Sequence, residues 1–154
     1  MVSPCRKIRI PINEPADPVG SKGQISEFLD AYHGEGIQHV ALAAEDIYTT
    51  VEQLSGTGVS FHDTPDTYYE AVDSRLPCHG EDIQRLRENR ILIDGPPTDN
   101  SGLLLQIFTN TVIGPIFFEL IQRKGNEGFG EGNFKALFDS IELDQIKRGV
   151  LIAA

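Results

Sequence analysis

Two residues that could bind a metal ion stand in apolar surroundings. Glu119 lies within IFFELIQR, residues 116–123, and His39 lies within GIQHVALAA, residues 36–44, both of which read as buried strands. A buried carboxylate without a partner is costly, so such a group normally faces a cation. Imidazole nitrogen and carboxylate oxygen are ligands that suit a borderline or hard divalent metal. The pair therefore indicates a metal site, provided that both side chains point into the same space.

The alternation of side chains along a strand gives the composition of that space. Within LLLQIFT, residues 103–109, the period of two puts Gln106 and Phe108 on one face. On its own strand His39 shares a face with small alanines, which leave room beside the imidazole. One face of the expected sheet thus combines an acid, an amide, an imidazole and aromatic rings.

Each of these residues also has a purely structural interpretation. A single histidine on an apolar strand is often a hydrogen-bonded core residue, so His39 need not be a ligand. Glu119 could pair with Arg123, which lies on the same face of its strand. Gln106 and Asn13 could satisfy buried backbone groups. The residues alone leave these alternatives open.

Composition limits the class of protein. The chain has 154 residues, 40% of them hydrophobic, which is enough for one domain with an ordinary core. Its net charge of −10, with scattered basic residues, argues against nucleic acid or an acidic membrane surface as a partner. Cys5 and Cys78 do not form a disulfide framework, and no segment resembles a membrane span or a signal peptide. We therefore expect the protein in the cytoplasm.

The elements that position these residues follow from hydrophobic periodicity and from capping residues. We expect strands over 7–12, 36–44, 59–62, 90–95, 103–109 and 116–123, and helices over 24–32, 47–54, 67–76, 81–89 and 133–148. Asp46 should cap the second helix, and Asn133 and Gly149 should bound the last one. The expected buried face of the last helix is Phe134, Leu137, Phe138 and Ile141. This order predicts an α+β fold with a curved, largely antiparallel sheet.

Six segments in one order also carry a resemblance to a known family. They are GIQHVAL, PDTYYE, RLP, LLLQIF, FFELIQRKG and GFGEGNFKALF. In this order and spacing they resemble the C-terminal half of the 4-hydroxyphenylpyruvate dioxygenase family, which belongs to the vicinal oxygen chelate superfamily, over about residues 3–151. The resemblance implies three parts: the end of a preceding module at 1–33, a βαβββ metal-binding module at 34–123, and a glycine hinge with a C-terminal gate helix at 124–154.

The resemblance implies a cofactor and two of its ligands. The family holds a non-haem Fe(II) with two histidines and one glutamate, an arrangement that leaves open positions for substrate and oxygen. His39 matches the second histidine and Glu119 the glutamate. The family's first histidine belongs to an earlier strand, which would lie upstream of Met1, so we expect the catalytic domain to be incomplete. The isolated chain is accordingly expected to be inactive.

The resemblance also implies a substrate and the residues around it. The family converts 4-hydroxyphenylpyruvate, an aromatic 2-oxo acid, and O2 into homogentisate and CO2 in tyrosine catabolism. The residues expected to bind substrate are Asn13, Gln24, Gln106, Phe108, Phe129, Asn133 and Phe134. The helix from Asn133 would be the gate, with the glycines of 125–132 as its hinge, and we expect a homo-oligomer.

Two other functions remain open at this stage. The chain could be a non-catalytic half-domain of the same fold that self-associates through exposed sheet edges. It could also resemble 4-hydroxymandelate synthase, which uses the same substrate and iron but hydroxylates the side chain. A histidine ligand encoded upstream of this sequence would favour a dioxygenase over the non-catalytic half-domain. The product formed would distinguish a dioxygenase from a 4-hydroxymandelate synthase.

Overall fold

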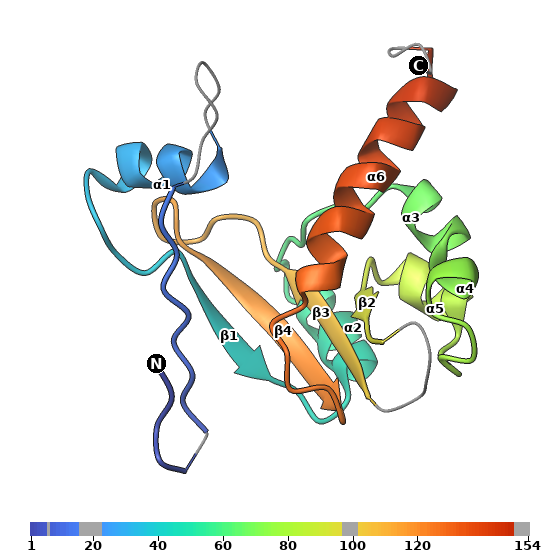
Figure 1. Ribbon diagram of the computed structural model, residues 1–154, viewed down its shortest axis with the longest axis horizontal. Coiled ribbons are helices and arrows are strands. Elements are labelled where there is room, and N and C mark those ends of the chain that lie inside the picture. Colours follow the sequence, from blue (N-terminus) through green and yellow to red (C-terminus); the bar gives the residue numbers. More distant parts are fainter. Residues whose placement is uncertain (6, 16–22, 97–101, 150–154) are drawn as a thin grey trace.

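The structure is a computed structural model that describes residues 1–5, 7–15, 23–96 and 102–149. Its centre is a mixed sheet of four strands, β1 (His39–Ala43), β2 (Leu92–Asp94), β3 (Leu103–Phe108) and β4 (Phe117–Lys124), in the order β1-β4-β3-β2. The β1 strand runs parallel to β4, whereas the pairs β4–β3 and β3–β2 are antiparallel (Figure 1). The predicted α+β fold with a curved, mostly antiparallel sheet is thus confirmed.

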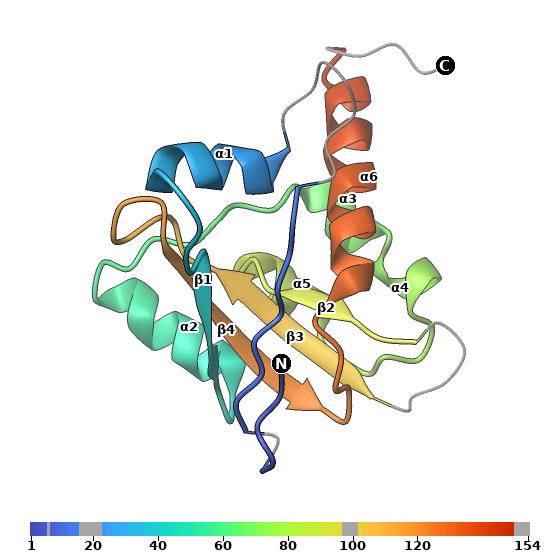
Figure 2. The same ribbon diagram turned by 60° about the vertical axis from the view of Figure 1, so that its left-hand side comes forward.

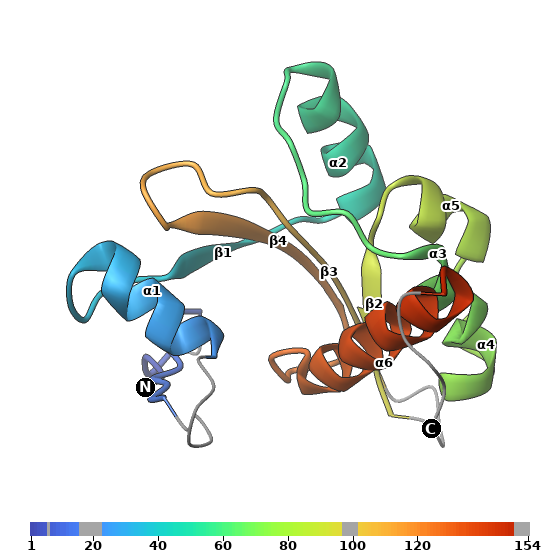
Figure 3. The same cartoon turned by 90° about the horizontal axis from the view of Figure 1, so that it is seen from above.

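Six helices surround this sheet in the described part of the chain. They are α1 (Gln24–Tyr32), α2 (Ile47–Gly56), α3 (Asp66–Glu70), α4 (Val72–Arg75), α5 (Ile83–Glu88) and α6 (Glu131–Lys147). Seen from above, α2 lies on one side of the curved sheet and α1 and α6 lie on the other (Figure 3). Among the described helices, none combines the length and the apolar character that a membrane crossing needs.

The core lies on the α2 side of the sheet and at its β2 end. Alternation along β3 turns the odd residues 103, 105 and 107 toward this core. They pack with apolar side chains of α2, of the short helices and of β2; the fully buried ones are Ile47, Val51, Tyr68, Tyr69, Val72, Leu86, Ile91, Ile93, Leu105 and Ile107. The even residues of β3 therefore face α6, as Gln106 does through its contact with that helix.

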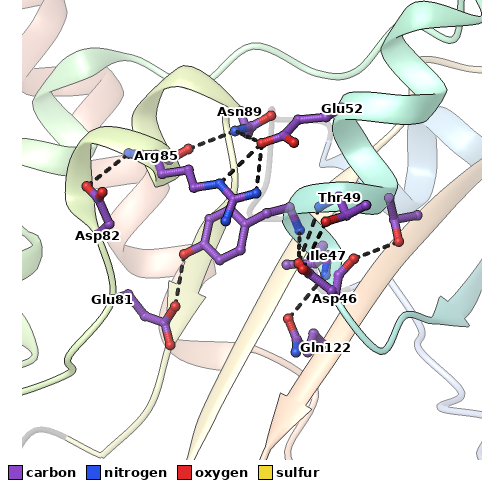
Figure 4. Close-up of polar contacts among 11 residues, drawn as sticks. Asp46, Ile47, Thr49, Glu52, Glu81, Asp82, Arg85, Asn89 and Gln122 are labelled. Carbon is purple, nitrogen blue, oxygen red and sulfur yellow. Dashed lines mark hydrogen bonds and ion pairs between the residues drawn. The ribbon is translucent and has the colours of Figure 1, made fainter.

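Polar contacts fix α2 against the loop before α5 (Figure 4). Asp46 caps α2 as expected, since its carboxylate accepts hydrogen bonds from the backbone N–H groups of Tyr48 and Thr49. The hydroxyl of Tyr48 donates to Glu81 at 2.9 Å, and the guanidinium of Arg85 lies 4.5 Å from the centre of the same ring. Burial and the neighbouring carboxylate of Glu81 raise the pKa of Tyr48. This cluster joins α2 to the segment around α5.

Several predicted elements are shorter than expected or absent. The expected strand over 7–12 is reduced, among described residues, to a single bridge between Val2 and Arg9. The expected strand over 59–62 is a single bridge between Phe61 and Thr109, and the helix over 67–76 is divided into α3 and α4. The β1 strand begins only at His39. These segments lie at the margins of the sheet, where few partners stabilise regular pairing.

The last helix differs most from the expectation. It begins at Glu131, with Gly130 as its N-cap, so Asn133 lies within the first turn and does not cap it. Phe134 is 67% exposed and Ile141 42% exposed, so the predicted buried face is wrong at both positions. The side chain of Phe138 lies outside the described part of the structure. The residues of α6 that are buried are Asn133 and Ser140, because α6 packs on α3 and β2 through polar contacts.

Candidate metal centre

His39 and Glu119 lie together on the α6 side of the sheet. The parallel register of β1 and β4 pairs His39 with Phe117 and Ala41 with Glu119, so both side chains project from the same face. The Nε2 atom of His39 lies 3.6 Å from the Oε2 atom of Glu119. Alternation within each strand predicted the face of each residue, and the register brings the two side chains into contact.

The second nitrogen of His39 has a partner that leaves Nε2 free. The Nδ1 atom lies 3.3 Å from the side-chain oxygen of Gln38, and because this oxygen only accepts, the contact favours the tautomer with the proton on Nδ1. The ring stacks on Phe117, with centroids 5.0 Å apart and planes at 15°. Histidine ligands of metals commonly donate their other N–H in this way. The lone pair of Nε2 is therefore directed toward Glu119.

Glu119 is buried, with one oxygen satisfied and the other facing His39. The amide of Gln106 donates to Oε1 at 2.8 Å. Burial raises the pKa of Glu119 to about 7, although Gln106 and Arg123 oppose this shift, and burial lowers the pKa of His39. Without a bound cation, both groups thus favour their neutral forms. Once Glu119 is ionised, two lone pairs face each other, and a cation between them removes the conflict.

The alternative pairing of Glu119 with Arg123 is not formed. The guanidinium of Arg123 donates instead to the backbone carbonyls of Asn126, at 2.9 Å, and Gly128, at 2.6 Å. It therefore stabilises the loop that leads to α6. Its charge favours the ionised form of Glu119 only at a distance.

The donor set fits part of a divalent metal site. A metal bound at about 2.1 Å by both atoms, at a right angle, would hold them about 3 Å apart. The observed 3.6 Å between Nε2 and Oε2 needs only a small side-chain shift to reach this. Within the described ranges, no group of three or more His, Cys, Asp or Glu residues gathers around a common point. The described residues thus offer two candidate ligands.

The other histidines have different surroundings. His79 is buried, with Nε2 3.1 Å from Asp73 and with Nδ1 accepting the N–H of Glu81 at 2.9 Å. It stabilises the turn before α5. The backbone N–H of His62 donates to the carbonyl of Phe108, and its side chain is exposed. His33 is exposed at the end of α1.

The predicted substrate residues fall into two groups. Gln106 and Phe108 lie at the site: Gln106 contacts Glu119, and the ring of Phe108 meets Phe117 edge-to-face with centroids 5.9 Å apart. The side chains of Asn13, Gln24, Phe129 and Phe134 are exposed. Their contact with substrate remains a prediction.

Asn133 is the predicted residue whose surroundings differ most from the expectation. Its side-chain amide donates to the carbonyl oxygen of Gln106 at 2.7 Å, and its own oxygen accepts from the hydroxyl of Tyr68 at 2.6 Å. Helix α6 therefore reaches Glu119 through a single intervening residue. This contact is more specific than the capping role that the sequence indicated.

Sequence reasoning missed three residues of the site. Strict alternation puts Gln38 on the face opposite to His39, yet its flexible side chain reaches the adjacent imidazole. Phe117 shares the face of Glu119, and this spacing was a usable signal for its contact with His39. Tyr68 lies 65 positions before its partner Asn133, and no pattern in a single sequence links residues at such a distance.

The chain is similar to known proteins over nearly its whole length. A model of the glyoxalase/bleomycin resistance protein/dioxygenase superfamily matches residues 1–72. Over 98% of its length the chain is 66% identical to a 4-hydroxyphenylpyruvate dioxygenase from Pseudomonas aeruginosa, of which it covers 41%. The resemblance to the 4-hydroxyphenylpyruvate dioxygenase family is confirmed. The chain thus spans about two-fifths of the length of such a relative, which agrees with similarity to one portion of the family's chain.

Other relatives show variation of function within this fold. The chain is 66% identical to hemolysin VllY from Vibrio vulnificus, again over 98% of the chain and 41% of the relative. Among solved structures, a mutant of 4-hydroxymandelate synthase from Streptomyces coelicolor is similar at 40% identity and a TM-score of 0.65. That match covers 81% of this chain and 35% of the synthase. Similarity of fold therefore leaves the product to be decided by experiment.

Proposed function

We propose that this chain supplies two protein ligands, His39 and Glu119, to the Fe(II) site of a dioxygenase acting on 4-hydroxyphenylpyruvate. The observation that carries the proposal is the approach of His39 Nε2 and Glu119 Oε2 to 3.6 Å on one face of the sheet. The reaction would consume O2 and give homogentisate and CO2. The third protein ligand would come from residues outside those described.

The side chains around the pair have distinct tasks in this reaction. When bound, Fe(II) supplies the redox chemistry and open positions for a 2-oxo acid and O2. Gln38 fixes the tautomer of His39, and Gln106 fixes the orientation of Glu119. The rings of Phe108 and Phe117 form an apolar wall beside the imidazole. This wall limits the access of water and offers a surface for an aromatic substrate.

A chimeric enzyme tests the proposal. In the Pseudomonas aeruginosa relative, the segment that matches this chain is replaced by the chain itself, and homogentisate and O2 consumption are measured together. We expect homogentisate formation with near-equal O2 consumption. His39→Ala and Glu119→Gln should each reduce the rate by at least about 100-fold, because each removes a metal ligand, and losing a group that only orients a ligand already costs about 10- to 100-fold.

The control is His62→Ala, which removes an exposed histidine outside the pair and should retain the rate. An iron-loaded, folded chimera that consumes 4-hydroxyphenylpyruvate but releases 4-hydroxymandelate would support the synthase alternative, which is motivated by the 40% identical solved structure. Normal homogentisate formation by Glu119→Gln would contradict the proposed ligand set.

A further inference from the structure

A line of buried polar side chains connects Glu119 with helix α6. It runs from Glu119 to Gln106 on β3, then to Asn133 on α6, then to Tyr68 on α3, with links of 2.8, 2.7 and 2.6 Å. All four side chains are buried. Buried networks of this kind are costly when one link is lost, because low dielectric strengthens both the bonds and the penalty for an unpaired group.

The line has one direction. An ionised Glu119 can only accept, so Gln106 must present its NH2 group to it. The carbonyl oxygen of Gln106 then faces α6, and Asn133 must present its NH2 group in turn. The remaining oxygen of Asn133 accepts from a hydroxyl. The charge of Glu119 thus determines the orientation of two amides, and the second amide belongs to the helix.

The far end of the line is fixed as well. The hydroxyl of Tyr68 accepts from the N–H of Ile93 at 2.9 Å and from the guanidinium of Arg75 at 2.8 Å. Arg75 also donates to the carbonyl of Ile93 at 2.9 Å. The Tyr68 hydroxyl also lies 3.0 Å from that carbonyl. Because the carbonyl already accepts from Arg75, we assign the single hydroxyl proton of Tyr68 to the shorter contact with Asn133. The line ends on a cation, which polarises every donor toward Glu119.

Glycines allow α6 to approach this closely. A Cβ atom on Gly130 would lie 1.9 Å from the side-chain oxygen of Gln106, and the φ of Gly130 is +80°. A Cβ atom on Gly132 would lie 2.2 Å from a carboxylate oxygen of Asp94, and the carboxylate of Asp94 accepts the N–H of Gly132 at 3.1 Å. The start of the helix is thus seated against both β3 and β2 (Figure 2).

We propose that Asn133 is a positioning residue for the metal ligand Glu119, acting through Gln106, so that docking of α6 and metal binding favour each other. The proposal rests on the proposed function for its metal-binding half only. Docking holds the Gln106 amide against Oε1 of Glu119, which leaves Oε2 directed toward His39. By linkage, metal binding must increase the docking of α6 by the same factor as docking increases metal affinity.

The first arm of the test needs no metal. Asn133→Asp keeps the shape of the side chain but offers two acceptors, so Gln106 must turn its NH2 group toward α6 and its oxygen toward Glu119. Hydrogen exchange of the first turn of α6 is measured by mass spectrometry on the full chain at about pH 8. We expect exchange to be at least about 10-fold faster, since a mispaired buried group is costly. Unchanged exchange would overturn the proposal.

The second arm is a rescue. In Glu119→Gln, the new amide can present NH2 to the turned oxygen of Gln106, so a line of reversed direction is complete in the double variant with Asn133→Asp. In the Glu119→Gln background, Asn133→Asp should therefore change the hydrogen-exchange rate of the first turn of α6 only slightly. Equal losses in both backgrounds would show that Asn133 supports only its own helix, which would overturn the proposal.

Two controls exclude a purely electrostatic rescue. Gln106→Met removes the intermediate amide but keeps both charges, and in this background the effect of Asn133→Asp should no longer depend on residue 119. Persistence of the dependence would mean that direct repulsion between the introduced carboxylate and Glu119 carries the effect, against the proposal. Gln145→Glu adds the same charge to α6 three turns farther along, about 18 Å away, and should leave exchange of the first turn unchanged.

The metal arm uses Co(II) added to the same variants, followed by its absorption spectrum. Asn133→Asp adds a negative charge, so simple attraction predicts tighter Co(II) binding, whereas loss of the Gln106 contact predicts binding weaker by about 10-fold. Tighter binding would overturn the coupling. If neither His39→Ala nor Glu119→Gln changes the affinity for Co(II), the proposed function is wrong. The hydrogen-exchange measurements would still decide the role of Asn133.

Discussion

Glu119 makes the stability of the chain depend on pH when no metal ion is bound. Its pKa is about 7 in the fold because of burial, against about 4.3 for an exposed glutamate. The folded state therefore binds the proton more tightly, so the free energy of unfolding should fall as pH rises from about 4.3 to about 7. The total loss is at most about 4 kcal/mol.

The difference between the original chain and Glu119→Gln isolates this effect. The lowered pKa of His39 acts in the opposite direction, because the folded state prefers neutral imidazole and loses stability as pH falls below about 6.5. Urea unfolding of both proteins is measured at several pH values, and the difference between their free energies of unfolding removes the contribution of His39, which both contain. We expect Glu119→Gln to be the more stable protein above pH 7, and equal stability at every pH would show that the carboxyl is not strained by burial.

Alternation with a fixed period predicted which residues share a face with His39 and with Glu119 on their own strands. The parallel register of β1 and β4, which alternation does not reveal, brings the two side chains to one face. Residue types and alternation did not reveal the function of Asn133. An asparagine before a helical pattern is typical of an N-cap, and here the buried amide contacts of Asn133 with Gln106 and Tyr68 hold it inside the first turn. Tertiary hydrogen bonds of this kind leave no periodic signal.

At the scale of elements, the approach of α6 to the sheet depends on two small residues. Gly130→Ala places a methyl group where the Gln106 oxygen lies and requires a left-handed backbone of a residue with a Cβ atom. We expect a loss of about 1–3 kcal/mol in the free energy of unfolding, together with weaker metal binding, because Gln106 must move away from Glu119. Thermal unfolding and Co(II) titration measure the two effects.

A matched substitution separates stability from site geometry. Asp46→Ala removes the cap of α2 on the opposite side of the sheet and should cost about 1 kcal/mol. Its Co(II) affinity should equal that of the original chain. If Gly130→Ala and Asp46→Ala lose stability alike and both keep their metal affinity, the fit of α6 to Gln106 has no influence on the site.

Regular elements followed from the sequence where burial was strong. The α2 helix with its Asp46 cap and the strands β3 and β4 lie close to their expected ranges. The expected strands over 7–12 and 59–62 fail because each finds only a single bridge as partner among described residues. Pairing between strands depends on neighbours distant in sequence, which local alternation does not identify.

At the scale of the molecule, β1 is an edge strand with one unpaired side in the described sheet. Val40 is 40% exposed and Leu42 46% exposed on this strand. Exposed apolar edges of this kind readily pair with another chain. We therefore expect the isolated chain to self-associate, with Leu42→Lys reducing the association. Sedimentation over a range of concentrations measures the self-association. If the original chain and Leu42→Lys have the same mass at every concentration, any association does not use the edge of β1.

The central claim is that His39 and Glu119 bind one divalent metal ion. The most direct measurement is paramagnetic broadening of NMR signals by Mn(II), a hard divalent ion, titrated into the isolated chain, because broadening detects even the weak binding expected of two ligands. We predict that the ring signals of His39 and the backbone signals around Glu119 broaden first, while those of His62 and His79 persist, and that Glu119→Gln abolishes this selectivity. Broadening that begins at other residues, or that is unchanged in Glu119→Gln, would contradict the account.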